Sequence, residues 1–271
     1  MKHVAINTGS LGKQTPLALE RAAGLGFRTV EVNLQTEEFG YGYQRKPNVR
    51  FYRELRRQVD SLGLSVWSVS APPLTQAQMF YERARKDILM QAAGAAGILG
   101  AQVFVTYPAD LFTTEIQFET YLREDRAPAT IEGFDEAWAQ VVNRRMTMAL
   151  VNWQHWLGAP LTNQAERMAK ITDDLAIGCA LDMRRAVTRG ALADWLEKIS
   201  ERLAVAYLYD LAAGEGEVSP AYRAPLDSQW QEWLPLLAGT RLKCLVMRAD
   251  PEQSDEEITR SRVYVEDLVS K

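Results

Sequence analysis

Polar and charged side chains recur in this sequence directly after short runs of apolar and β-branched residues. Glu31 lies within VEVNL, Asn152 follows TMALV, and Asp182 follows AIGCAL. Carboxylates and arginines at such positions could transfer protons or bind an anionic molecule. The candidate binding residues are Glu31, Tyr107, Asn152, Asp182, Arg185, Tyr207, Asp210 and Arg248. Glu31 and Asp182 are the two candidates for a catalytic acid or base.

These candidates also have structural interpretations, which the sequence leaves open. Glu31 could pair with an arginine inside the fold, and Asp182 or Asp210 could cap the segment that follows it. Tyr107 and Tyr207 could be packing residues at the rim of a sheet. The tertiary structure has to decide between these roles and contact with a ligand.

The elements that position these residues alternate along the whole chain. Apolar runs predict eight β-strands, over residues 3–9, 29–34, 65–71, 102–108, 147–153, 176–183, 204–210 and 243–248. Segments of helical period lie between them, and Gly26 and Gly63 are typical of helix ends. Eight such units in 271 residues predict an α/β fold, a single (β/α)8 TIM barrel domain over residues 1–271. An open doubly wound sheet is the alternative, although its usual glycine fingerprint is missing from the first turn.

Two connections are longer than such a barrel needs. Residues 35–48 and 109–133 follow the second and fourth predicted strands. Because the loops after barrel strands often form lids and binding loops, we expect extended loops here. A decorated surface or an oligomer contact is the alternative.

Composition excludes several classes of function. The chain has only two histidines, His3 and His155, so a site with several imidazoles cannot be built. The net charge of −4 and the lack of a basic stripe argue against nucleic acid. No apolar stretch approaches the roughly 18 residues of a membrane span and no signal peptide is recognisable, so we expect a cytoplasmic protein without membrane contact. Cys179 and Cys244 lie in apolar runs and are expected to be buried thiols.

The order and spacing of several segments resemble the xylose isomerase-like superfamily. These barrels include sugar phosphate isomerases and epimerases, and the endonuclease IV type of repair enzyme is related. The segments that carry the resemblance are TGSLGKQTPLALERAAGLGFRTVEVNL, LRRQVDSLGLSVWSVSAPP, AAGAAGILGAQVFVTYP, LVNW, CALDM, AYLYD and VMRADPEQSDEEITRSRVYVEDL. The resemblance implies a divalent metal at the barrel mouth, held by carboxylates and histidines, and proton transfer between adjacent carbons.

This sequence departs from the family pattern at the ligand positions. Of the four usual metal ligands only Asp182 remains in register, and the two glutamate positions are Val151 and Val246. Positions where the family has histidine are occupied by Ser70, Tyr107, Arg185 and Tyr207. One aspartate beside an arginine would hold a hard cation poorly, so we expect no metal and no other cofactor.

Three functions remain open from the sequence. The leading hypothesis is a barrel without its metal site that binds a small polar or anionic, sugar-like ligand, as a pseudoenzyme or atypical binder. The second is an active isomerase or epimerase with metal-free proton transfer, in which Arg185 or Arg248 stabilises the developing charge. The third is a scaffold for a protein partner or a homo-oligomer. A metal-dependent enzyme of the family type ranks last.

Overall fold

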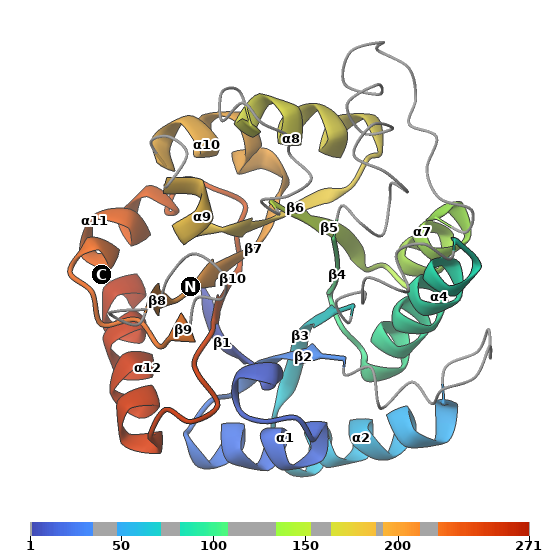
Figure 1. The fold of residues 1–271 in the computed structure, drawn as a ribbon, viewed down its shortest axis with the longest axis horizontal. Helices are drawn as coiled ribbons and strands as arrows, with labels where there is room; N and C mark the ends of the chain where they lie inside the picture. The colour runs from blue at the N-terminus through green and yellow to red at the C-terminus, as the bar shows by residue number, and fades with distance from the viewer. Residues whose placement is uncertain are drawn as a thin grey trace.

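Eight parallel strands close into a barrel, as the sequence predicts (Figure 1). The computed structural model describes residues 2–34, 48–71, 82–107, 134–152, 164–187, 192–211 and 222–270. The barrel order is β1-β10-β7-β6-β5-β4-β3-β2. Its strands are β1 His3–Asn7, β2 Thr29–Asn33, β3 Ser65–Ser70, β4 Val103–Thr106, β5 Thr147–Val151, β6 Gly178–Asp182, β7 Leu203–Leu208 and β10 Cys244–Met247.

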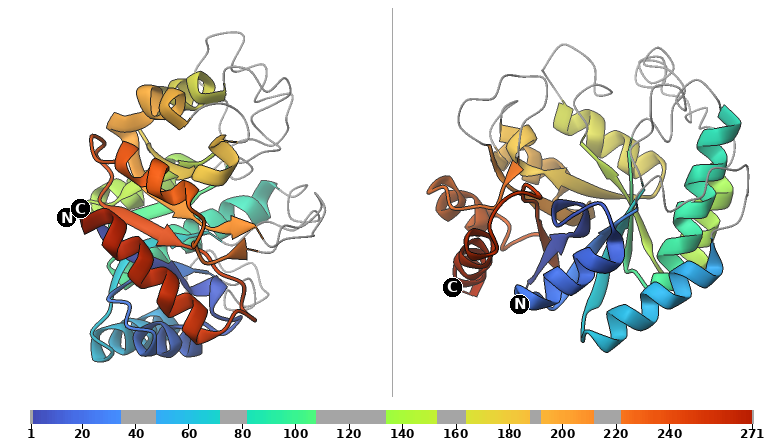
Figure 2. Two further views of the ribbon diagram at one scale, coloured as in Figure 1. Left: turned by 90° about the vertical axis from the view of Figure 1, so that its left-hand side faces the viewer. Right: turned by 60° about the horizontal axis from the view of Figure 1, so that its bottom comes forward.

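Helices form the outer layer around this barrel (Figures 1 and 2). The longer ones are α1 Thr15–Gly24, α2 Val49–Ser61, α4 Glu82–Leu99, α7 Phe134–Asn143, α8 Gln164–Asp174, α10 Leu192–Ile199, α11 Gln229–Leu236 and α12 Asp255–Ser270. Shorter pieces are η1 Thr8–Ser10, α9 Met183–Val187 and η3 Ser200–Arg202. Gly26 and Gly63 follow α1 and α2 with φ of 82° and 66°, which confirms them as left-handed helix ends.

The core has two layers, inside and outside the barrel wall. The outer layer lies between strands and helices, where strand residues such as Val30 and Leu181 meet helix residues such as Leu19 and Met168. The inner layer fills the barrel with mostly small side chains: Ala5, Val103, Val105, Ala149, Val151, Ala180, Val205, Tyr207, Cys244 and Val246. The interior is therefore packed along most of its length, as in other barrels of this size. Cys179 and Cys244 are buried free thiols, as expected.

The structure differs from the sequence-based expectation after the seventh strand. The prediction extends that strand to residue 210, but β7 ends at Leu208. Asp210 instead begins β8 Asp210–Leu211, which pairs antiparallel with β9 Tyr222–Arg223 outside the barrel. The sequence does not predict this pair because each of its strands has two residues, too few to show a period.

Some expectations fall on parts of the chain that are not described. The loop predicted over 109–133 lies outside the described residues. So does the loop over 35–48, except for Asn48, whose side chain caps α2 by accepting a hydrogen bond from the backbone N–H of Phe51. The described part of the third predicted helix begins at Glu82.

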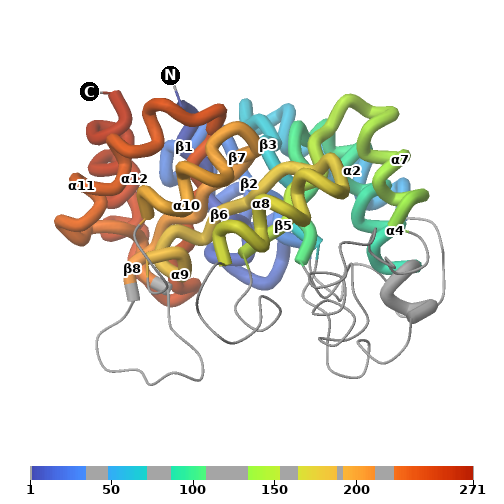
Figure 3. The backbone as a smooth tube through the Cα atoms, turned by 90° about the horizontal axis from the view of Figure 1, so that it is seen from above, coloured from blue at the N-terminus to red at the C-terminus, as the bar shows by residue number. Residues whose placement is uncertain are grey.

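Both ends of the chain lie at one end of the barrel (Figures 2 and 3). In Figure 3, β8 and α9 lie at the other end. Because β8 and α9 follow the last residues of β7 and β6, that other end carries the carboxyl ends of the strands. Within the described residues, no helix is long and apolar enough to cross a membrane.

Candidate functional site

Glu31 is fully buried in the middle of a set of donors from three other strands. The register places Asn7 of β1 and Ser68 of β3 beside it on the neighbouring strands. Asn7 Nδ2 donates to Glu31 Oε1 over 2.6 Å, and Ser68 Oγ donates to Oε2 over 2.7 Å. Tyr207 of β7 reaches across the interior and donates its hydroxyl to Oε2 over 3.0 Å. The carboxylate is therefore solvated by protein groups in place of water.

Burial dominates the ionisation of this group. It raises the pKa of Glu31 above its ordinary value, while the charge of Arg248 and the three hydrogen bonds act in the opposite direction. Burial and the nearby Glu31 carboxylate also raise the pKa of Tyr207 well above 10.0. Tyr207 therefore keeps its proton and acts as a donor at neutral pH.

Arg248 connects the Glu31 network to a second buried carboxylate. It follows β10, and its guanidinium lies 3.9 Å from the centre of the Tyr207 ring. Its Nη1 is 3.9 Å from Oδ2 of Asp182. A guanidinium over an aromatic face in a largely desolvated place is favourable and holds the cation in a fixed position.

Asp182 ends β6 and is held by residues from both sides. Its backbone N–H donates to Asn152 Oδ1 over 2.6 Å, and Asn152 Nδ2 returns a hydrogen bond to its carbonyl over 3.1 Å. The Tyr209 hydroxyl contacts both carboxylate oxygens, at 2.9 and 3.1 Å. Arg185 donates its backbone N–H over 3.2 Å and places Nε 3.3 Å from Oδ2. Asp182 therefore caps α9 and also belongs to the polar cluster at this end of the barrel.

The structure brings together most of the residues that the sequence singled out. Tyr107 is half-buried and packs against the inner layer of the barrel. Tyr209 is a member that the sequence does not predict. It lies one residue beyond β7, where strand alternation no longer indicates which way a side chain points.

Asp210 lies in a different network, and its contacts are structural. Its carboxylate accepts hydrogen bonds from Trp230 Nε1 over 2.7 Å and from the backbone N–H groups of Leu226 and Asp227 over 2.7 and 2.9 Å. Arg184 forms ion pairs with both Asp210 and Asp227. Asp210 thus anchors the segment before α11 to β8. This is a structural role, but it differs from a cap on the segment directly after the strand, which was the structural alternative suggested by the sequence.

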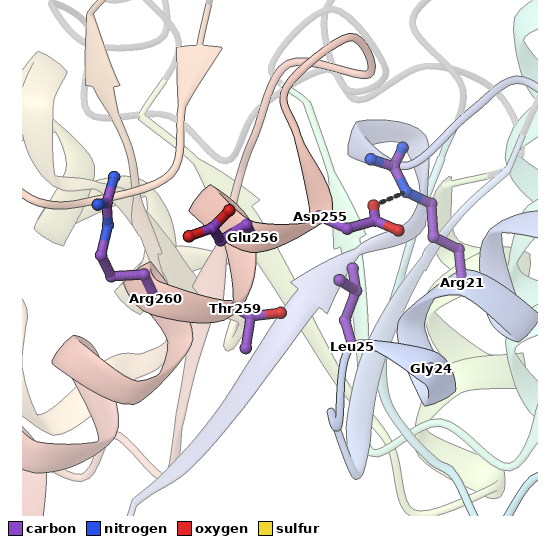
Figure 4. A pocket seen from close by; sticks show the side chains of 7 residues that line it. All are labelled: Arg21, Gly24, Leu25, Asp255, Glu256, Thr259 and Arg260. Atoms are coloured by element: carbon purple, nitrogen blue, oxygen red, sulfur yellow. Dashed lines mark hydrogen bonds and ion pairs between the residues drawn. The ribbon is translucent and has the colours of Figure 1, made fainter.

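A groove of about 560 Å³ lies elsewhere, on the outside of the barrel between α1 and α12 (Figure 4). Arg21 on its wall pairs with Asp255 at 2.7 Å and donates to the carbonyls of Leu11, Pro251 and Gln253. These contacts attach α1 to the segment before α12. The exposed remainder of the wall mixes both signs of charge, so we assign no ligand to this groove.

The fold is a (β/α)8 TIM barrel, and it is similar to the folds of solved xylose isomerase-like barrels. No family model matches the sequence, and no curated protein matches it significantly. Among solved structures, a xylose isomerase domain protein from Alicyclobacillus acidocaldarius is 14% identical with a TM-score of 0.65, covering 99% of this chain and 98% of that one. A sugar phosphate isomerase/epimerase from Parabacteroides distasonis is 16% identical with a TM-score of 0.63, covering 99% and 95%. A D-allulose 3-epimerase from Methylomonas sp. is 10% identical with a TM-score of 0.64, covering 98% of each chain.

The donor set at the barrel mouth does not suit the divalent metal that this fold family implies. Val151 and Val246 point into the apolar inner layer. Within the described residues, no three His, Cys, Asp or Glu side chains lie close enough together to hold an ion. Asp182 already faces the guanidinium groups of Arg185 and Arg248. Two fixed cations beside a single aspartate would repel a divalent ion.

Proposed function

We propose that this barrel binds a small anionic, hydroxylated ligand at the carboxyl end of its strands, without a divalent metal, and acts by binding or regulation. The observation that carries the proposal is the pair of arginines at Asp182. Arg185 and Arg248 place two guanidinium groups around one carboxylate, and their side chains keep 18% and 11% of their surface exposed. The planar donor fork of a guanidinium group suits a carboxylate or phosphate group.

The rest of the cluster would position the ligand. Asp182 and the ring of Tyr207 fix the direction of the two guanidinium groups, so little side-chain entropy is lost when an anion binds. Glu31 contributes negative charge from below, but its oxygens are occupied by three donors. In this binding role Glu31 orders the site and does not contact the ligand.

A thermal-shift titration with a defined panel tests the proposal. The panel contains glucose 6-phosphate, gluconate, glucuronate and the neutral sugar fructose. We expect at least one anionic member to raise the melting temperature and fructose to have no effect. Arg185→Ala should weaken that ligand at least tenfold, which corresponds to the loss of one charge-assisted hydrogen bond. Arg53→Ala, an exposed arginine of α2, is the matched control and should bind as the wild type does.

Two results would overturn the binding proposal. One is a panel without any stabilising anion, and the other is an Arg185→Ala variant with an unchanged response. Metal analysis of the purified protein separately tests the proposal that the site works without a divalent metal. Near-stoichiometric Mn, Mg, Co or Zn would refute a site without metal.

A second function is favoured by the raised pKa of Glu31. A buried carboxyl whose pKa is shifted toward neutrality is a typical acid or base, so metal-free proton transfer in an isomerase or epimerase is the alternative. Glu31 would take a proton from one substrate carbon and return it to the neighbouring carbon. Incubation with sugar phosphates in deuterium oxide tests this, because exchange of a carbon-bound hydrogen would support it. The exchange must disappear in Glu31→Gln, and exchange that persists there refutes the role of Glu31.

A further inference from the structure

A second hollow lies at the amino end of the barrel strands, away from the candidate site. Its volume is about 400 Å³. Its wall includes the first residues of β4, β5, β6 and β7, which are Val103, Thr147, Gly178 and Leu203. Because these strands are parallel, their first residues meet at the end opposite to Asp182 and Arg248. The hollow is large enough for a small organic molecule.

The rim of this hollow is strongly basic. Its charged side chains are Arg145, Arg202, Arg241, Lys243 and a single carboxylate, Glu201. Glu201 pairs with Arg241 at 2.8 Å, and Arg202 pairs with Asp173. Within the described part of the chain, neither Arg145 nor Lys243 forms an ion pair. Two cations without an ion-pair partner on one rim are notable in a chain whose net charge is −4.

Apolar side chains form part of the wall. Trp67, Val103 and Leu203 line the hollow, and the Trp67 ring lies 5.7 Å from the ring of His3. The indole Nε1 of Trp67 is buried and has no acceptor among the described residues. A planar body could pack against the indole ring.

The backbone at Arg145 is unusual for a residue with a side chain. Five helix-to-strand turns end in the same pattern of two hydrogen bonds, with a residue of positive φ at the same place: Gly26, Gly63, Gly100, Arg145 and Ala176. Glycine is the usual residue there because a side chain strains the left-handed backbone. Arg145 has φ of 59° and Ala176 has φ of 52°, and both line the hollow. An arginine at this position therefore carries a cost in backbone strain. Among the described residues its guanidinium has no carboxylate partner, so what it adds to the rim is a positive charge.

We propose that this hollow binds a phosphomonoester with a planar ring, independently of the site at the other end of the barrel. A phosphoryl group carries a charge of about −1.5 to −2 at pH 7, which matches the two cations Arg145 and Lys243. The ring would lie against the apolar wall beside Trp67. Carboxylates carry half this charge and would bind more weakly.

Calorimetric titration at low salt with adenosine 5′-monophosphate, ribose 5-phosphate and adenosine tests the proposal. We expect the nucleotide to bind more tightly than ribose 5-phosphate, and adenosine not to bind. Affinity for the nucleotide should fall as salt is added, because the rim is exposed. Arg145→Gly and Lys243→Gln should each weaken the nucleotide roughly tenfold, the equivalent of one charge-assisted hydrogen bond.

Two matched variants serve as controls. One separates the effect of lost charge from the effect of a changed backbone, and the other separates this hollow from the site at the carboxyl end of the strands. Arg145→Gly relieves the backbone strain and is expected to fold, and Ala176→Gly makes the same backbone change without loss of charge, so it should bind as the wild type does. Arg185→Ala should also leave nucleotide binding unchanged. The proposal is overturned if the nucleotide does not bind, if Arg145→Gly binds it normally, or if Arg185→Ala abolishes its binding.

Discussion

The hydroxyl of Tyr207 provides a direct test of the buried Glu31 network. Tyr207→Phe removes the hydroxyl that donates to Glu31 over 3.0 Å but keeps the ring beneath Arg248. A hydrogen bond to a charged group contributes about 1.5–3 kcal/mol. Ser68 still donates to the same oxygen over 2.7 Å, so the expected loss lies at the lower end, about 1.5–2 kcal/mol.

The loss of stability in Tyr207→Phe should also depend on pH, because the Tyr207 hydroxyl stabilises the ionised form of Glu31. Without it the pKa of Glu31 in the folded state rises further above its ordinary value of 4.5. The folded variant then retains its proton to higher pH than the folded wild type does. The difference in the free energy of unfolding should therefore be small near pH 4, where the carboxyl is protonated, and should grow as pH rises.

Urea unfolding of both proteins between pH 4 and pH 8 measures this difference. Tyr264→Phe is the matched control, because the Tyr264 hydroxyl donates over 3.0 Å to a neutral acceptor, the carbonyl of Asp227. Its loss should be about 1 kcal/mol or less and should not vary with pH in this range. A Tyr207→Phe difference below about 0.5 kcal/mol, or one that is constant with pH, would refute an ionised and hydrogen-bonded Glu31.

Three further predictions concern the fold and its ionisation. Gly63→Ala should destabilise the protein by about 1 kcal/mol in chemical unfolding, because φ is 66° and an added Cβ meets nothing closer than 4.0 Å, which leaves backbone strain as the cause. Ala176→Gly should have the opposite sign, and equal stability of both variants would contradict the strain argument. Asp210→Ala should cost about 3 kcal/mol and expose Trp230 to fluorescence quenchers, since it leaves Arg184 and two backbone N–H groups short of a partner. Because the pKa of Glu31 is raised in the folded state, the free energy of unfolding of the wild type should fall as pH rises from 4.5 toward that raised pKa. Glu31→Gln must lack this dependence on pH.

The barrel itself follows from local patterns in the sequence. Strand and helix periods are set by neighbouring residues, so all eight strands are recognisable without tertiary information. Gly26 and Gly63 mark helix ends for a local reason as well, because only the left-handed backbone closes those turns. Arg145 and Ala176 adopt the same conformation without glycine, and nothing in the local sequence indicates it.

The sequence also determined which polar residues end the barrel strands, since these follow from counting along each strand. That valine occupies two ligand positions was implied by the resemblance to the xylose isomerase-like superfamily. Only the closed barrel decided which of these residues meet. Tyr207 and Glu31 are 176 residues apart in the chain and touch because their side chains point into the same narrow interior. Tyr209 joined the cluster and Asp210 left it, because both lie beyond the last residue of β7, where the barrel ladder no longer fixes the direction of a side chain.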